Sequence, residues 1–110
     1  AKDYVRAMWL MLQQDKPDTY VIATGVTHSV RDFVSEAFKC VGVDDYEKFV
    51  EIDQKQIRPS EVPYLKGDCS KAKEMIGWMP EISFEDLVSI MVQHDIERIT
   101  NDTQATYSVK

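Results

Sequence analysis

An arginine and a glutamate lie three positions apart in the run Arg58-Pro59-Ser60-Glu61-Val62. The arginine side chain presents a planar fork of donors that suits phosphate oxygens. A carboxylate accepts hydrogen bonds, and it can take both hydroxyls of a ribose cis-diol. Pro59 restricts the preceding residue to extended backbone, which stiffens the position of Arg58. Together the two side chains are suited to grip the ribose and diphosphate of a nucleotide.

Each of these residues also has a purely structural interpretation. Arg58 can tie down its own loop through a salt bridge, and Glu61 can act as a cap or as an ion-pair partner of Arg58 itself. The two interpretations are compatible, because a preformed pair would hold both side chains in place for a ligand. Three lysines, Lys55, Lys66 and Lys71, either add positive field around the motif or belong to a solvated surface of mixed charge.

Four helices and two short strands are predicted to position this loop. Apolar spacing predicts helices over residues 2–14, 30–41, 70–76 and from Ser83 to about 100. Two β-prone runs, Tyr20-Val21-Ile22-Ala23 and Phe49-Val50-Glu51-Ile52, predict the strands. Residues 53–69 hold two prolines and little periodicity, so they are expected to form the loop that carries binding residues.

Apolar positions predict which helix faces are buried. The first helix has one face of Val5, Met8, Trp9 and Leu12, and further apolar residues widen it, so we expect it to be covered on more than one side. Ser29 with Asp32 predicts the start of the second helix. The last helix has a predicted buried stripe, whose members are Phe84, Leu87, Val88, Met91, Val92, Ile96 and Ile99.

Composition narrows the function classes. The 110 residues amount to one domain, and a net charge of −6 argues against nucleic acid or an anionic membrane as the partner. No apolar run approaches the roughly 20 residues of a membrane span. Cys40 and Cys69 have no disulfide-framework spacing, and we expect them to be buried or partly buried free thiols of a cytoplasmic protein. His28 and His94 are not at ligand spacing from them, so no metal site is expected.

The sequence around the arginine resembles a known family. The run Arg58–Val62, followed by Gly67-Asp68-Cys69-Ser70-Lys71-Ala72 and Gly77-Trp78-Met79-Pro80, is similar to the C-terminal, substrate-side region of extended short-chain dehydrogenases that modify nucleotide sugars. Within that group it looks most like the GDP-mannose 4,6-dehydratase family. Three further blocks also resemble this family, and with them the resemblance extends over residues 1 to about 100; they are residues 1–9, 24–33 and 49–53.

The resemblance implies a site and a partner lobe. It assigns Arg58 to the diphosphate of GDP-mannose and Glu61 to the ribose hydroxyls. The family's glycine-rich dinucleotide turn and its Tyr-x-x-x-Lys motif do not occur in this sequence. We therefore expect a C-terminal fragment, inactive alone, of an NADP-dependent lyase whose cofactor is held by an absent Rossmann lobe.

The expected fold class follows from the same resemblance. It is α/β: a small, mostly helical substrate-binding lobe, residues 1–100, with two or three short strands and a polar, frayed tail over 101–110. The whole enzyme is expected to be a cytoplasmic homo-oligomer that converts GDP-mannose to GDP-4-keto-6-deoxymannose.

Two other interpretations are open. Another nucleotide-sugar dehydratase or epimerase would use the same arginine-and-acid clamp for a UDP or dTDP sugar. Alternatively, the chain is a non-catalytic protein-interaction module, in which Arg58 and Glu61 form only a structural pair. Selective binding of GDP-mannose would separate these alternatives.

Overall fold

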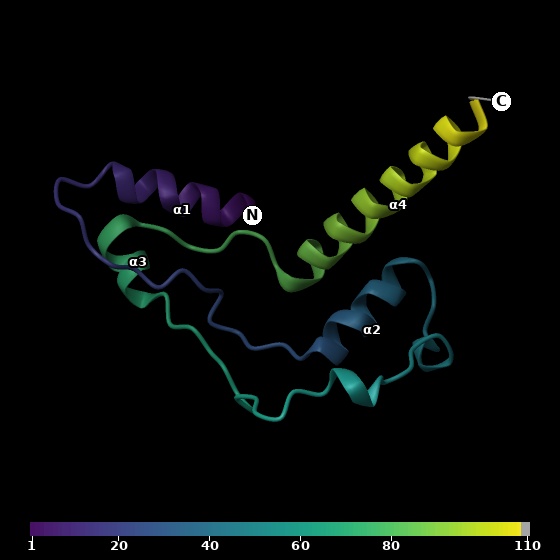
Figure 1. Cartoon of the computed structure of the whole chain (residues 1–110). Helices are drawn as coiled ribbons and strands as arrows, with labels where there is room; N and C mark the ends of the chain where they lie inside the picture. The colour runs from purple at the N-terminus through teal and green to yellow at the C-terminus, as the bar shows by residue number, and fades with distance from the viewer. Residues whose placement is uncertain (109–110) are drawn as a thin grey trace. The chain divides into compact units, whose positions relative to one another are not determined.

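The computed structural model describes residues 1–108, with side chains described up to residue 102, and it is mostly helical. Four α-helices and two short 3₁₀ turns follow one another along the chain (Figure 1): α1 (Lys2–Leu12), α2 (Val30–Cys40), η1 (Tyr46–Lys48), η2 (Gln54–Gln56), α3 (Ser70–Ile76) and α4 (Phe84–Ser108). The chain divides into two compact units. Unit 1 contains residues 1–28 and 54–82, and unit 2 contains residues 29–53 and the chain from 83 onward.

The core of unit 1 is formed where α1 and α3 meet the residue after α3. Ala7, Ala72, Ile76 and Trp78 are buried there, and Trp78 has no exposed surface. Partly buried side chains surround this cluster: Leu10, Met11, Tyr20, Ile22 and Cys69. Gly77 ends α3 with a φ of 69°, a left-handed conformation that glycine adopts without steric cost, and this turn directs Trp78 back into the core.

The apolar face predicted on α1 is present but exposed. Val5, Met8, Trp9 and Leu12 have exposed fractions of 60%, 61%, 60% and 81%. The helix instead packs through the side that carries Ala7, Leu10 and Met11. The small Ala7 side chain allows the helix backbone to approach its neighbours closely, and the larger side chains are left on the surface.

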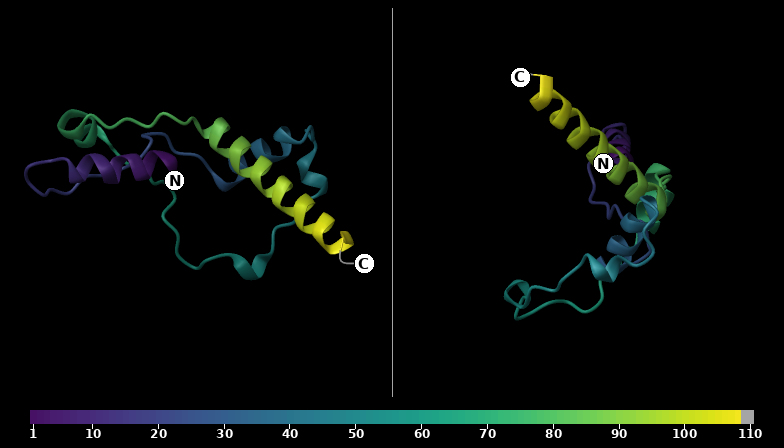
Figure 2. Two further views of the ribbon diagram at one scale, coloured as in Figure 1. Left: turned by 90° about the horizontal axis from the view of Figure 1, so that it is seen from above. Right: turned by 90° about the vertical axis from the view of Figure 1, so that its right-hand side faces the viewer.

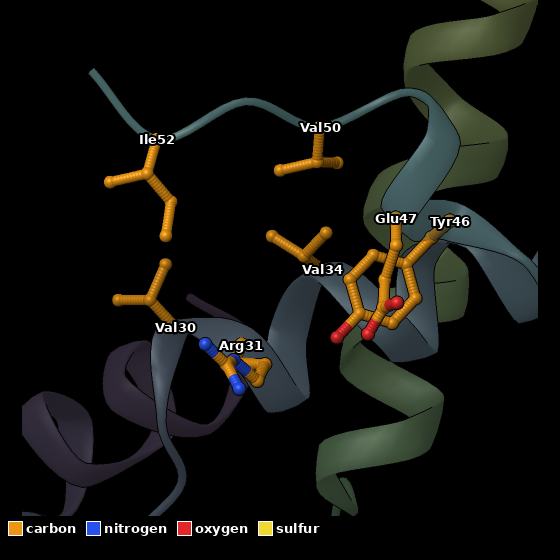
Figure 3. Close-up of a pocket in the computed structure, with 7 residues that line it drawn as sticks. All are labelled: Val30, Arg31, Val34, Tyr46, Glu47, Val50 and Ile52. Carbon is orange, nitrogen blue, oxygen red and sulfur yellow. The ribbon is translucent and has the colours of Figure 1, made fainter.

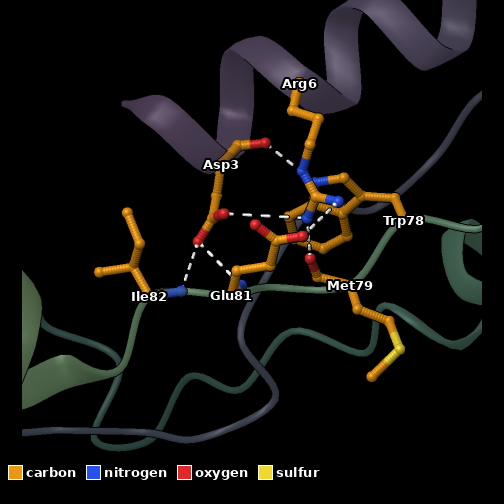
Figure 4. A network of polar contacts seen from close by, with 6 residues as sticks. All are labelled: Asp3, Arg6, Trp78, Met79, Glu81 and Ile82. Carbon is orange, nitrogen blue, oxygen red and sulfur yellow. Dashed lines mark hydrogen bonds and ion pairs between the residues drawn. The ribbon is translucent and has the colours of Figure 1, made fainter.

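A polar network joins α1 to residues 78–82 of the same unit (Figure 4). The carboxylate of Asp3 accepts hydrogen bonds from the backbone amides of Glu81, at 3.2 Å, and Ile82, at 3.1 Å. The indole Nε1 of Trp78 donates to the backbone carbonyl of Asp3 at 2.9 Å. Arg6 donates to the carbonyl of Met79 and forms an ion pair with Glu81 at 3.0 Å. Asp3 thus binds a segment almost eighty residues away in the sequence.

Unit 2 is built from α2, η1 and α4. The predicted start of α2 is confirmed: Ser29 and Asp32 form a reciprocal capping box. Phe33 of α2 packs edge-on against Phe84 of α4, with ring centroids 6.2 Å apart. Only Val88 of the stripe predicted on α4 is buried. The 11-residue α2 is too short to cover a 25-residue helix, so Leu87, Met91, Ile96 and Ile99 remain 38% to 60% exposed.

The last helix is longer than the sequence predicted. In both views of Figure 2, α4 runs as one continuous helix, and it extends to Ser108. The frayed tail expected over 101–110 is therefore helical over residues 101–108, and residues 109–110 lie outside the described residues. The hydroxyl of Ser83 accepts a hydrogen bond from the amide of Asp86, which confirms the predicted start of this helix.

The two predicted strands are not present among the described residues, so this part of the fold prediction is wrong. Residues 20–23 and 49–52 are non-helical segments without ladder hydrogen bonds in the part of the chain that the structure covers. A strand forms only when a neighbouring backbone satisfies its amides and carbonyls. These runs have a β-prone composition, but composition alone supplies no partner strand.

Candidate functional site

The two residues that the sequence selected lie in one exposed loop of unit 1. Arg58 and Glu61 are both solvent-exposed and follow the short turn η2. Neither side chain forms a hydrogen bond or an ion pair within the described part of the chain, so the structural pair considered for them is not formed there. The guanidinium and the carboxylate are therefore available for an external ligand. Their positions as ligand-binding residues stay a prediction.

The end of this loop lies against the segment around residues 23–27, through one hydrogen bond and one close backbone approach. The hydroxyl of Thr27 donates to the backbone carbonyl of Leu65 at 2.5 Å. Two residues further on, Gly67 passes so close to Ala23 that a Cβ added at Gly67 would lie 2.4 Å from the Cβ of Ala23. These contacts pair 27 with 65 and 23 with 67, so the two segments run side by side in opposite directions.

Lys71 continues this pairing at the start of α3. Its ammonium donates to the carboxylate of Asp18 and to the backbone carbonyl of Thr19, each at 2.9 Å, and lies 5.2 Å from the centre of the Tyr20 ring. The hydrogen bond from Lys71, together with that from the Thr19 amide, lowers the pKa of Asp18. Lys71 is thus engaged by Asp18, which favours the structural alternative over a role in adding positive field around Arg58.

The preceding turn is fixed by its own carboxylate. Asp68 accepts hydrogen bonds from the hydroxyl of Ser70 at 2.5 Å and from its amide at 2.9 Å, and both lower the pKa of Asp68. Ser70 is the first helical residue of α3, and its amide donates to the Asp68 side chain.

A second feature, in unit 2, is an apolar pocket of about 410 Å³. Two aliphatic pairs face each other across it: Ile52 lies opposite Val30, and Val50 lies opposite Val34 (Figure 3). Arg31, Tyr46 and Glu47 complete the lining. These residues come from α2, from η1 and from the segment after it, so no local sequence pattern could have identified the pocket. Its walls suit aliphatic groups better than a doubly charged diphosphate.

The cysteines and the metal-ligating residue types were the other candidates for chemistry. Cys69 is partly buried against the core of unit 1, as predicted, whereas Cys40 is an exposed free thiol, so the predicted burial is wrong for Cys40. Among the described residues no three histidine, cysteine or acidic side chains come together to hold a metal ion. Within the same part of the chain, no helix combines the length and apolar character needed to cross a bilayer.

Sequence analysis missed Thr27 as an individual residue. Its block of residues was recognised, but its hydroxyl partner lies thirty-eight positions away. The available signal was indirect: a glycine at position 67 between two polar loop residues indicates a close backbone approach to some other segment. Which segment it approaches depends on the tertiary structure.

The fold and the loop define a mostly helical module that presents an arginine and a carboxylate to solvent. Comparison with known proteins identifies the family more specifically. The sequence pattern of a family described as GDP-mannose 4,6 dehydratase matches residues 1–91. The chain is 56% identical over 97 residues to GDP-mannose 4,6 dehydratase 1 of Arabidopsis thaliana, an alignment covering 88% of this chain and 27% of that protein. It is 42% identical over 121 residues to the GDP-mannose 4,6 dehydratase of Homo sapiens, covering 96% and 32% of the two chains.

A bacterial relative extends the comparison. The GDP-mannose 4,6-dehydratase of Vibrio cholerae is 41% identical over 123 residues, covering 88% of this chain and 33% of that protein. The chain therefore belongs to the GDP-mannose 4,6-dehydratase family. It spans about a quarter to a third of the length of the curated relatives it matches.

Proposed function

We propose that this chain is the nucleotide-sugar-binding region of a GDP-mannose 4,6-dehydratase. Arg58 would contact the diphosphate of GDP-mannose, and Glu61 would accept hydrogen bonds from the ribose hydroxyls. The observation that carries this proposal is the state of the two side chains. Both are exposed on one loop, and neither is engaged by the rest of the described chain.

The whole enzyme would convert GDP-mannose to GDP-4-keto-6-deoxymannose with loss of water, using NADP. The residues of this chain do not fit that cofactor. Gly25, Gly42, Gly67 and Gly77 lack the spacing of a dinucleotide turn, and the described residues hold no strand from which such a turn could begin. NADP would therefore be held by a separate Rossmann lobe, and the 110 residues alone would be inactive.

The exposed face of α1 supports a partner lobe. Val5, Met8, Trp9 and Leu12 recur at the spacing of one helix face, and each is at least 60% exposed. An apolar helix face of this kind is normally covered. We propose that it packs against the rest of a family-length dehydratase. The same proposal includes a cytoplasmic location, which the two free cysteines favour, and a homo-oligomeric whole enzyme.

Substitution of Arg58 tests the ligand-binding part of this proposal. Calorimetric titration of the chain with GDP-mannose should give an affinity that Arg58→Ala lowers about 10- to 100-fold, because a hydrogen bond to a charged group contributes roughly 1.5–3 kcal/mol. Arg58→Lys should retain the charge but lose the two-pronged contact, so it should fall between the two.

The control is Arg31→Ala, which removes an arginine from the pocket of unit 2 and should leave the affinity unchanged. Equal losses in the Arg31 and Arg58 variants would contradict the assignment of the loop. Titration with UDP-glucose and dTDP-glucose tests the base: equal affinity for all three sugars would favour another nucleotide-sugar enzyme. The absence of binding to any of them would favour an interaction module.

A further inference from the structure

We propose that Thr27 is a positioning residue for the Arg58–Glu61 loop. By donating its hydroxyl proton to the carbonyl of Leu65, it would hold the loop in the conformation that receives a nucleotide sugar. This inference rests on the proposed function, because it concerns how the same loop is held. It adds a residue that does not itself contact the ligand.

The loop has few internal restraints. Residues 57–66 contain no helix and no strand, and all of them are exposed. At their start, the amide of Ile57 bonds to the carbonyl of Gln54 at 3.4 Å, a long hydrogen bond. Within the described part of the chain, the bond from Thr27 to Leu65 is the other hydrogen bond that reaches this loop. Leu65 is only four residues after Glu61, so this bond controls the exit of the loop.

The segment that carries Thr27 is itself fixed to the core. Tyr20 and Ile22 pack against the buried cluster of unit 1, and Lys71 binds the carbonyl of Thr19. Thr27 therefore connects the exit of a loop that has few other restraints in the described structure to a segment that packs against the core. Its hydroxyl thus links the backbone of the loop to the neighbouring segment.

The expected effect follows from a shift in population. The affinity of a ligand falls in proportion to the fraction of the protein in the competent conformation. A typical hydrogen bond contributes about 0.5–1.5 kcal/mol. Loss of the Thr27 hydroxyl should therefore weaken GDP-mannose binding about 2- to 10-fold, without removing any group that touches the ligand.

Three variants of the whole chain separate positioning from other effects. Thr27→Val replaces the hydroxyl with a methyl group of similar size, and Thr27→Ser keeps the hydroxyl. Thr19→Val makes the same chemical change in the same segment, at a side chain with no hydrogen bond in the described structure. Two readouts are needed: the Kd for GDP-mannose, and the hydrogen exchange of amides 57–66 without ligand.

Positioning predicts that Thr27→Val weakens binding and speeds amide exchange in the loop, while Thr27→Ser and Thr19→Val behave as the unmodified chain does. Unchanged loop exchange in Thr27→Val would overturn the inference. So would equal effects of the valine and serine variants. If the unmodified chain does not bind GDP-mannose, the exchange measurement still decides: faster exchange in Thr27→Val supports positioning while the proposed function fails.

Discussion

Lys71 and Arg58 differ in what surrounds them, although the sequence grouped them as one positive cluster. Lys71 is surrounded by a carboxylate, a carbonyl and an aromatic ring of its own unit. Arg58 has no such partners in the described chain. Of the three lysines that flank the motif, Lys71 is therefore already bound to a carboxylate, so less positive charge is available to a diphosphate than the sequence suggests. Substitution of Lys71 by a neutral residue should therefore affect the stability of unit 1 more than it affects the positive charge offered to a ligand.

The Asp18–Lys71 pair makes a pH-dependent prediction. The pKa of Asp18 lies below its ordinary value of 3.8, chiefly because Lys71 donates a hydrogen bond to the carboxylate. A lowered folded-state pKa means that the pair stabilises the fold above pH 3.8, and that this contribution disappears as the pH falls through the lowered value. Carboxyl NMR titration should give a midpoint for Asp18 below 3.8, and Lys71→Met should raise it.

Lys73→Met provides the matched control, since Lys73 is on the same helix and has no ion pair in the described residues. It should leave the Asp18 midpoint where it is. A midpoint that moves equally in both lysine variants would show that general charge, rather than the direct hydrogen bond, sets this pKa.

At the scale of elements, the N-terminus of α1 is joined by hydrogen bonds to residues 81 and 82 of unit 1. Asp3, in the first turn of α1, accepts two backbone amides from residues 81 and 82, and its side chain is only 17% exposed. Asp3→Ala should lower the free energy of unfolding of this unit by about 1.5–3 kcal/mol, since hydrogen bonds to a charged acceptor are lost. Urea titration followed by the NMR signal of the Trp78 indole proton would measure this.

Asp15→Ala is the appropriate comparison, because Asp15 is exposed and makes no ion pair or hydrogen bond within the described chain. Its urea midpoint should match that of the unmodified protein. If Asp3→Ala and Asp15→Ala unfold at the same urea concentration, the network in Figure 4 contributes nothing measurable.

The elements that sequence predicted well are those set by local interactions. The capping box at Ser29 and the left-handed Gly77 depend on neighbours within a few positions, so their residue types are sufficient. The strand predictions and the predicted burial of the α4 stripe were wrong, because strand formation and burial depend on which segments pack opposite in the tertiary structure. The candidate site divides in the same way: Arg58 and Glu61 were found from their chemistry, whereas Thr27 depends on a contact with a distant segment.

At the scale of the whole molecule, the exposed face of α1 predicts assembly. Mixing the chain with the rest of the Arabidopsis thaliana dehydratase 1, from which the matching 97 residues have been removed, should give a complex in size-exclusion chromatography. The double variant Met8→Glu and Leu12→Glu should weaken this complex at least about 100-fold, because each apolar side chain contributes about 1.5–3 kcal/mol when buried.

Lys2→Glu is the control, since it makes the same change in net charge as the double variant, at an exposed polar position of the same helix. It should leave the complex intact. If the Lys2 variant dissociates as readily as the double variant, net charge rather than the apolar face governs assembly.

The two tryptophans of the chain occupy opposite environments, since Trp78 is fully buried and Trp9 is 60% exposed. Indole fluorescence is sensitive to the polarity around the ring. The isolated chain should therefore emit as two populations, a blue component that acrylamide quenches poorly and a red component that it quenches readily. Covering of α1 by a partner should shift the red component, and unfolding of unit 1 should shift the blue component most, because Trp78 is fully buried and Trp9 is already largely exposed. The protein thus contains separate optical reporters of its assembly and of its folding.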